Sequence, residues 1–309
     1  MGVYIIRRLL WMLPVLWGVV TIAFFLSRLA PGDPADAMAG QRASEEQRRA
    51  INERHGFDRP LYIQYGKYLF NLLRGDLGLS YDSQRPVAQL ILERFPNTVI
   101  LATSAMIAAV FLGVSAGLLS ALMPNSWFDR IAMVLSLLGI STPVFWLGLL
   151  LIYLFSIQLR LLPPSGFEGG DLRYLILPAI ALGTQSVAFL ARMTRASLLE
   201  IMNEEYLRTA RAKGASPFRV VFKHAFANAL IPIVTIIGLD FASYLSGSVL
   251  TEKVFSWPGL GRFLVTAIAQ RDYPSINGAV LFFSVIFIAI NLIVDLLYAY
   301  LDPRIRYET

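Results

Sequence analysis

The chain has 309 residues, of which 56% are hydrophobic and only 16% are charged, and its mean hydropathy is +0.58. This composition excludes a soluble domain and indicates an integral membrane protein. The net charge of +6 is distributed as membrane topology requires, so we expect no nucleic-acid partner. The sequence has no cysteine, which excludes disulfides and thiolate chemistry.

Six segments with few or no charges are each long enough to cross about 30 Å of hydrocarbon as a helix. They are residues 9–29, 98–121, 131–158, 174–192, 227–250 and 276–301. A chain in lipid must satisfy its own backbone hydrogen bonds, so we predict that all six are helices. The predicted fold is all-α, with six transmembrane helices in a single domain over residues 1–309.

The first predicted helix follows Arg7 and Arg8 and so resembles a signal peptide. Its uncharged run is longer than the usual hydrophobic region, and no convincing small-residue cleavage site follows it. We therefore interpret the segment as a retained membrane anchor.

The next segment, 32–97, holds nine basic and nine acidic residues and is too polar to cross the membrane. It also contains apolar and aromatic residues at helical spacing: Leu61, Tyr62, Tyr65, Tyr68, Leu69 and Leu72. We predict that 32–97 is a small folded lobe. Such a lobe either stabilises the helix bundle or docks an external partner, and the sequence leaves both roles open.

Small residues and prolines mark contacts and bends in the later helices. Gly113, Ala116 and Gly117 form a face on the second helix that would let another helix approach closely. Pro143 in the third helix and Pro232 in the fifth each remove a backbone donor and permit a bend.

Residues 193–226, between the fourth and fifth helices, are predicted to form a basic helix-turn-helix. Gly214 is placed to end one short helix, while Ser216 and Pro217 suit the start of the next. The second helix is expected to carry an apolar stripe made of Phe218, Val221, Phe222 and Phe226. Arg219 and Lys223 lie on its wetter face. The alternative is an ordinary loop whose basic residues only set topology.

Basic residues also predict the orientation, because Lys and Arg favour the cytoplasmic side in short loops. Both termini and the loops after the second and fourth helices hold twelve basic residues, against five in the opposite short loops. We therefore expect both termini and 193–226 in the cytoplasm of a cell with an inner or plasma membrane, and 32–97 outside.

Asp240 lies near the middle of the fifth helix, where a carboxylate is costly unless it faces water or a partner. Together with Ser243 it is a candidate for the translocation path, as a counter-charge to a cationic group on the cargo. The alternative is a structural carboxylate hydrogen-bonded across a helix contact, with Ser243 and Ser246 nearby.

Enzymatic motifs are missing from the sequence. It has no Gly-x4-Gly-Lys-Ser/Thr phosphate loop, and its two histidines, His55 and His224, do not have metal-ligand spacing. A membrane protease using Ser248 would need a base, and no histidine lies in a predicted helix. We expect no catalytic residue, no metal and no cofactor in this chain.

At this point a family resemblance becomes specific. Arg208-Thr209-Ala210, three residues and Gly214 resemble the Glu-Ala-Ala-x3-Gly coupling motif of ATP-binding-cassette (ABC) importer permeases, without its glutamate. The run from Glu205 to Gly214 is similar to the version in the dipeptide and oligopeptide permease branch. Further motifs of that branch follow in the expected order: Arg7-Arg8-Leu9-Leu10, Pro31-Gly32-Asp33-Pro34, Gly75-Asp76-Leu77-Gly78, Phe255-Ser256-Trp257-Pro258-Gly259-Leu260-Gly261, Arg271-Asp272-Tyr273-Pro274 and Asp302-Pro303-Arg304-Ile305-Arg306.

The resemblance implies the first of two permease subunits in a heteromeric importer, forming half of the translocation path. Its partners would be a second permease, two ABC ATPase subunits that bind ATP and Mg, an extracytoplasmic substrate-binding protein and membrane lipid. The residues expected to couple to the ATPases are Glu205, Arg208, Ala210, Gly214, Pro217, Phe218 and Phe222. The loop with Trp257, Pro258 and Gly259 would face the binding protein or border the outer gate, or Trp257 would be an interfacial anchor.

The resemblance implies a di- or oligopeptide cargo, with glutathione, a nickel chelate, haem or an oligosaccharide as alternatives. A hypothesis of another class is a self-sufficient channel or secondary carrier, in which the basic loop is only a topology signal.

Overall fold

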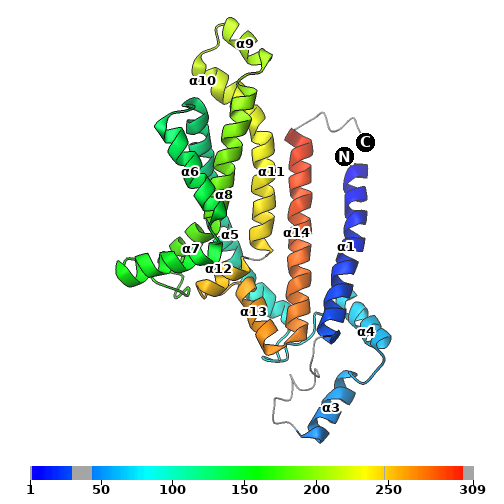
Figure 1. The fold of residues 1–309 in the computed structure, drawn as a ribbon. Helices are drawn as coiled ribbons and strands as arrows, with labels where there is room; N and C mark the ends of the chain where they lie inside the picture. Colours follow the sequence, from blue (N-terminus) through cyan, green and yellow to red (C-terminus); the bar gives the residue numbers. More distant parts are fainter. Residues whose placement is uncertain (1, 30–43, 247, 302–309) are drawn as a thin grey trace. The chain divides into compact units, whose positions relative to one another are not determined.

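The structure, a computed structural model, describes residues 2–29, 44–246 and 248–301, and these ranges are built from helices (Figure 1). The chain divides into two compact units. Among the described residues, the bundle unit contains 99–246, 248–257 and 287–301, and the lobe unit contains 2–29, 44–98 and 258–286. The motifs Pro31–Pro34 and Asp302–Arg306, and also Gly247, lie outside the described residues.

The bundle unit holds most of the membrane helices. Its elements are the main part of α5 (Val87–Leu122), α6 (Trp127–Ser141), α7 (Val144–Leu151), the π-helical η1 (Ile152–Gln158), α8 (Arg173–Ile201), α9 (Glu205–Ala212), α10 (Pro217–Arg219), the π-helical η2 (Val220–Ala225), α11 (Phe226–Leu245), α12 (Val249–Val254) and the second half of α14 (Tyr273–Leu301). Helix α8 is the centre of this unit, because α6, α7 and α11 all pack against it.

Glycines let α5 approach α8 closely, as the sequence predicted. A Cβ atom at Gly113 would lie 2.7 Å from the carbonyl oxygen of Val187, and one at Gly117 would collide with the backbone of Ala191. No residue larger than glycine fits either position without moving α8. Close backbone contact of this kind is how helices associate in lipid.

An ion pair joins α6 to α8. Ser126 caps α6 by accepting a 3.2 Å hydrogen bond from the Asp129 amide. The buried Asp129 carboxylate in turn accepts from Arg195 on α8, at 2.6 Å from Nε and 2.8 Å from Nη2. This forked geometry fixes both the distance and the rotation of the two helices.

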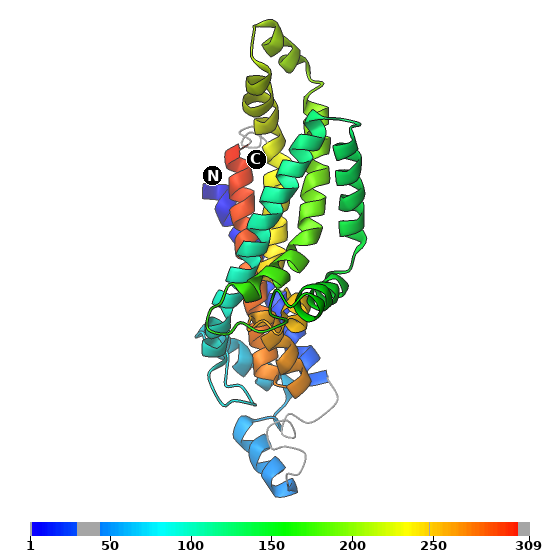
Figure 2. The ribbon, with the colours of Figure 1, turned by 90° about the vertical axis from the view of Figure 1, so that its left-hand side faces the viewer.

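The predicted third span is not one straight helix. Residues 127–141 and 144–158 meet at 105°, so that α7 and η1 turn away from α6 (Figure 2). Thr142 is extended, with ψ of 121°, because it precedes Pro143, and Pro143 supplies no amide hydrogen to continue the helix. The second predicted bend is gentler, at 46° between 217–230 and 232–245.

Four helices of the described chain are long and apolar enough to cross a membrane: Leu10–Leu29, Val87–Leu122, Arg173–Ile201 and Tyr273–Leu297. Counting each bent pair as one span raises the number to six. Helix α5 begins at Val87, earlier than the predicted 98, because charge at Glu93 and Arg94 ends the apolar run but not the helix. The predicted all-α membrane fold is confirmed.

The lobe unit contains α1 (Gly2–Leu29), α3 (Glu45–His55), α4 (Leu61–Leu73), the start of α5, α13 (Leu260–Gln270) and the first half of α14. The aromatic spacing in the sequence correctly predicted α4. Its Tyr65 hydroxyl lies 2.6 Å from Thr21 Oγ1 on α1, and the Tyr68 ring stacks on Phe24 at 5.4 Å. These contacts attach α4 to the end of the first membrane helix, α1.

Asp272 fastens the loop before α5 to the start of α14. Its Oδ2 atom accepts from Ser80 Oγ at 2.6 Å and from Ser275 Oγ at 2.7 Å, while Oδ1 accepts from the Tyr81 amide at 3.0 Å. A buried carboxylate needs such donors. The Arg271-Asp272-Tyr273-Pro274 motif therefore has a structural role in this unit.

Candidate coupling and translocation sites

The basic segment between α8 and α11 forms the expected corner, which we call the coupling hairpin (residues 204–226). Helix α9 ends at Ala212, and Gly214 follows with a φ of +80°, a conformation that L side chains rarely adopt. Ser216 then caps the next helix by accepting a hydrogen bond from the Arg219 amide, with Pro217 in its first turn. The predicted end and start signals are confirmed.

Buried side chains anchor the hairpin to the ends of α8 and α11. Leu207, Val220 and Ala225 are each at most 2% exposed and belong to one apolar cluster with Leu198 and Ala229. A polar contact beside the cluster ties α9 to α11, because the Tyr206 hydroxyl accepts a 2.8 Å hydrogen bond from Asn228 Nδ2. The hairpin is thus an extension of the bundle unit (Figure 1).

Two aromatic rings of the hairpin remain outside this cluster. Phe218 is 72% exposed and Phe222 is 41% exposed, and their ring centroids lie 4.4 Å apart. The predicted row of rings is present, because the Phe226 ring centroid lies 6.4 Å from that of Phe222, but Phe226 also packs against the buried cluster that contains Val220 and Ala225. The π-helical turn η2 spans Val220–Ala225, so this part of the hairpin does not follow the α-helical repeat on which the predicted stripe was based.

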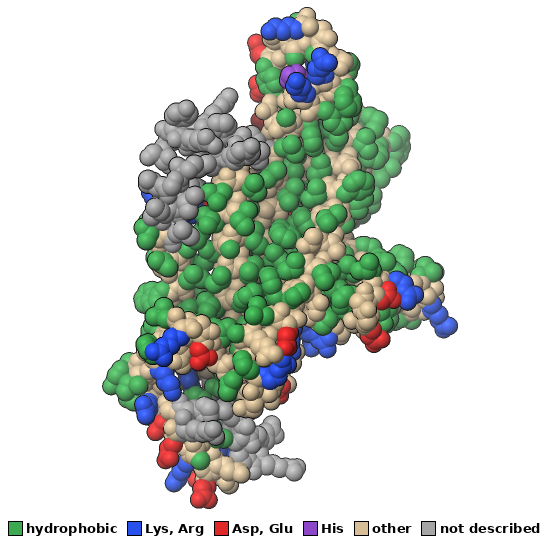
Figure 3. Space-filling view, turned by 180° about the vertical axis from the view of Figure 1, so that it is seen from behind, with side chains coloured by type: hydrophobic (Ala, Val, Ile, Leu, Met, Phe, Trp, Pro, Cys, Tyr) green, Lys and Arg blue, Asp and Glu red, His purple; other side chains and the backbone are tan. Residues whose placement is uncertain are grey.

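Exposed charged side chains accompany the ring pair on the hairpin. Lys and Arg gather at this end of the molecule, above a surface of apolar side chains (Figure 3). The exposed cations of the hairpin are Arg208, Arg211, Lys213, Arg219 and Lys223. Glu205 is exposed in the first turn of α9, where an acid suits the helix dipole, and Ala210 is half-buried on the same helix.

Asp240 lies on α11 and is half-buried against α8. Its Oδ2 atom accepts a 2.5 Å hydrogen bond from Ser186 Oγ, which also lies 2.6 Å from the Tyr244 hydroxyl. Tyr244 in turn donates to the Leu182 carbonyl at 3.0 Å. The carboxylate is therefore bonded across a helix contact, but through Ser186 and not through the serines that the sequence offered. Ser243 is exposed, and the hydroxyl of Ser246 bonds the Ala242 carbonyl.

The loop after α12 places Trp257 in the interior. Its side chain is fully buried and packs on the Phe167 ring at 4.4 Å, which excludes an interfacial anchor exposed to lipid headgroups. In the lobe unit the next residues are also fixed. The Pro258 carbonyl accepts from Asn97 Nδ2 at 3.0 Å, and Gly259 is buried at the start of α13.

Two family comparisons cover nearly all of the chain. Residues 109–307 match the binding-protein-dependent transport system inner membrane component family, and residues 1–102 match the N-terminal part of such membrane components. The chain belongs to this family. It is a membrane-spanning permease subunit of an ABC importer, not the self-sufficient carrier that the sequence left open.

Relatives of this permease are similar over their full length. It is 46% identical over 305 residues to the glutathione transport system permease protein GsiC of Escherichia coli (strain K12), covering 99% of both chains, and the GsiC protein of Shigella dysenteriae serotype 1 gives the same figures.

Solved structures support the fold of the permease. The MetNI methionine ABC transporter in an inward-facing conformation contains a chain with a TM-score of 0.60 and 18% identity, covering 70% of this permease and 97% of that chain. A chain of an amino acid ABC transporter crystallised with histidines gives a TM-score of 0.56 at 17% identity, with 69% and 94% covered.

Sequence reasoning missed several residues that hold the permease sites together. Leu207 and Val220 anchor the hairpin, and Ser186 and Tyr244 hold Asp240. The burial of Leu207 had a signal, since an isolated leucine in a basic helix must pack somewhere. Ser186 lies 54 residues before Asp240, and no local pattern in the sequence pairs them.

Proposed function

We propose that this permease carries small peptides, with glutathione as the first cargo to test. The observation that carries the proposal is the 46% identity to glutathione transport permeases over 99% of both chains. Glutathione is a tripeptide with an ammonium group and two carboxylates, so it lies within the peptide class that the sequence motifs predict. The similarity extends over the whole length of both chains and is not confined to one segment.

The coupling hairpin is our proposed contact with the two ATPase subunits, which bind ATP and Mg in place of this chain. Exposed aromatic rings on a hairpin that also carries exposed cations suit insertion into a groove on a partner. The hairpin is anchored through Leu207, Val220 and Ala225, so a push on Phe218 and Phe222 would reach α8 and α11 together. In this arrangement Glu205, Arg208 and Ala210 would contribute to the contact from α9, while Gly214 and Pro217 fix the turn between α9 and α10.

Asp240 and Ser243 are our proposed contacts in the translocation path, which this subunit shares with a second permease. A half-buried carboxylate near the middle of a membrane helix suits the ammonium group of a peptide. Trp257, Pro258 and Gly259 would border the outer gate, where an extracytoplasmic binding protein delivers cargo. We further propose that both termini and the hairpin lie in the cytoplasm, as the distribution of basic residues predicts.

The test uses the complete transporter, purified through a tag on this chain and reconstituted with its binding protein. We expect a second permease and ATPase subunits to co-purify, and ATP to drive uptake of labelled glutathione into vesicles. A dipeptide and an oligosaccharide serve as competitors. Uptake of the oligosaccharide, with glutathione ignored, would refute the peptide assignment while keeping the importer.

A further inference from the structure

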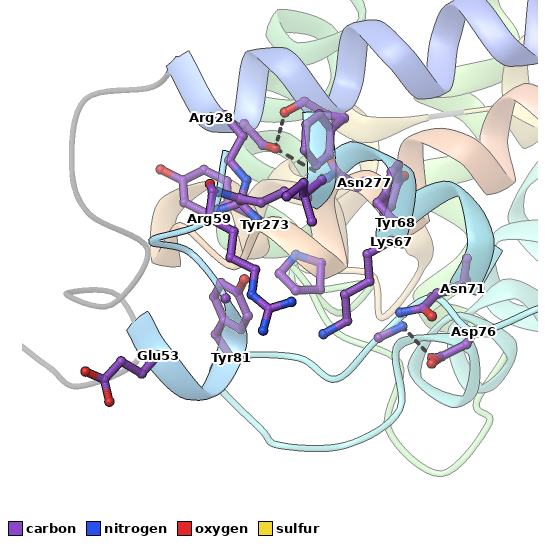
Figure 4. A pocket seen from close by; sticks show the side chains of 18 residues that line it. Arg28, Glu53, Arg59, Lys67, Tyr68, Asn71, Asp76, Tyr81, Tyr273 and Asn277 are labelled. Atoms are coloured by element: carbon purple, nitrogen blue, oxygen red, sulfur yellow. Dashed lines mark hydrogen bonds between the residues drawn. The ribbon is translucent and has the colours of Figure 1, made fainter. Parts of the chain in front are cut away.

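The lobe unit contains a cavity of about 260 Å³ at the end of α1, beneath α4 and beside the start of α14. Three cationic side chains line it: Arg28, Arg59 and Lys67. Figure 4 shows Arg59 and Lys67 extending their charged ends into the same space. They come from different segments of the chain, so the fold and not a local run of basic residues brings them together.

The acidic side chains of this cavity do not neutralise the three cations. Glu53 points away from the others, and Asp76 Oδ1 accepts a 2.8 Å hydrogen bond from the Gly78 amide (Figure 4). Within the described residues, no carboxylate lies within ion-pair distance of Arg28, Arg59 or Lys67. Like charges gathered in a half-enclosed space favour the binding of an anionic group.

Phenol hydroxyls add neutral donors to the cavity. Tyr68, Tyr81 and Tyr273 line it, and among the described residues their hydroxyls have no hydrogen-bond partner. Burial raises the pKa of both Tyr68 and Tyr81 to about 12, so these two hydroxyls keep their protons at neutral pH. The cavity therefore combines charged and neutral donors, as oxygen-rich anionic groups require.

An apolar groove of about 470 Å³ adjoins this cavity. Its walls are membrane-facing side chains of α1 and α14, among them Val19, Ile22, Ala23, Leu26, Ile276 and Val280. The groove and the cationic cavity share three lining residues, namely Ser27, Tyr273 and Asn277. Arg271 lies at the groove as a further cation.

We propose that the lobe unit binds an anionic phospholipid. Its phosphate lies among Arg28, Arg59 and Lys67, and one acyl chain follows the groove along α1. The position fits, because α1 is a candidate membrane span that ends at Leu29, so the groove lies at the depth of hydrocarbon and the cavity at the boundary with water. A soluble anion would use the cavity but has no need of the groove, and the continuity of the two favours the lipid.

The test is native mass spectrometry on the complete transporter, with short-chain phosphatidylglycerol, short-chain phosphatidylcholine and glycerol 3-phosphate as probes. We expect phosphatidylglycerol to bind most tightly. In the double variant R59Q/K67Q its affinity falls roughly 30-fold, the loss expected for two cationic contacts to an anionic lipid. The matched control is R49Q/R74Q, which removes the same charge from exposed lobe positions outside the cavity and leaves the affinity unchanged.

Further variants distinguish the sources of the anion. Lys67→Arg should keep phosphatidylglycerol bound, because it keeps the positive charge that binds the phosphate. Ala23→Trp should weaken binding, because the larger side chain blocks the acyl chain in the groove. Equal binding of phosphatidylcholine, or full binding in R59Q/K67Q, would overturn the proposal. Glycerol 3-phosphate as tight as the lipid would identify a soluble-anion site, and displacement by glutathione would identify a cargo site. Either result would replace the lipid without affecting the transport proposal.

Discussion

Ser186 on α8 donates a 2.5 Å hydrogen bond from its hydroxyl to the carboxylate of Asp240 on α11. Through Tyr244 the same network reaches the Leu182 carbonyl, so that one polar chain joins two helices of the bundle unit. The other oxygen of this carboxylate, Oδ1, accepts no hydrogen bond from the described residues. That oxygen could accept from a cargo ammonium while Oδ2 holds the helices together.

The first prediction separates these two roles by Asp240→Asn. The amide can still accept from Ser186, so the transporter should assemble normally. Uptake of glutathione should fall about tenfold, the cost of replacing a hydrogen bond to a charged group by a neutral one. Vesicle uptake at limiting cargo measures this loss. An N-acetylated cargo is the control, since it has no ammonium and should be transported equally by both proteins.

A complementary variant, Ser186→Ala, leaves the Asp240 charge but removes its donor. We expect lower thermal stability of the complex from this change, because a buried acceptor loses its partner. N-acetylation of the cargo should lower uptake by the wild type more than uptake by Asp240→Asn. An equal reduction in both proteins would contradict the cargo contact and leave only the structural role.

The second prediction concerns the exposed ring pair of the coupling hairpin. The double variant F218A/F222A should lower the affinity for the ATPase subunits about 30-fold or more, since buried aromatic anchors at interfaces cost at least 2 kcal/mol when truncated. The fraction of ATPase that co-purifies at increasing detergent and salt concentrations measures this affinity. Trp127→Ala is the matched control: its side chain is 79% exposed but lies outside the hairpin. Unchanged ATPase recovery in F218A/F222A would exclude these rings from the interface.

Local signals in the sequence predicted the parts of the fold that local chemistry determines. Gly214, Ser216 and Pro217 mark a corner because their backbone preferences act within a few residues. The aromatic spacing of α4 is likewise a property of one helix. Pro143 marks the position of a bend, but nothing in the local sequence gives its size of 105° or predicts the π-helical turn η2.

For the candidate sites, too, the sequence predicted what local signals determine and missed what depends on contacts between distant residues. The sequence placed the hairpin and singled out Asp240, since a charge in an apolar helix is visible without a structure. It could not assign Ser186 as the partner of that charge. It also gave no sign of the lobe cavity, whose three cations, Arg28, Arg59 and Lys67, are separated in sequence and meet only in the folded chain.

The third prediction tests the backbone of Gly214. Its φ of +80° makes a β-branched residue strained by about 1–2 kcal/mol, whereas asparagine tolerates this region. Open space surrounds the position, so any effect comes from the backbone and not from a clash. We expect Gly214→Val to weaken ATP-driven uptake several-fold and Gly214→Asn to be near wild type. Gly169→Val is the control, with a φ of +60° and equally open space in a different loop. Equal losses in both valine variants would indicate general destabilisation.

The fourth prediction compares two ion pairs of the bundle unit. Asp129 is 3% exposed and bonded by Arg195, so Arg195→Gln leaves a buried carboxylate without its charged partner and should destabilise the protein by about 3 kcal/mol. Asp171 and Arg173 form a similar pair, 2.7 Å apart, but the Arg173 side chain is 71% exposed. Arg173→Gln should therefore leave thermal unfolding in detergent unchanged. The double variant D129N/R195Q should recover part of the lost stability, because it removes the unpaired charge. A loss of stability equal to the sum of the losses in Asp129→Asn and Arg195→Gln, measured singly, would show that the pair does not couple α6 to α8.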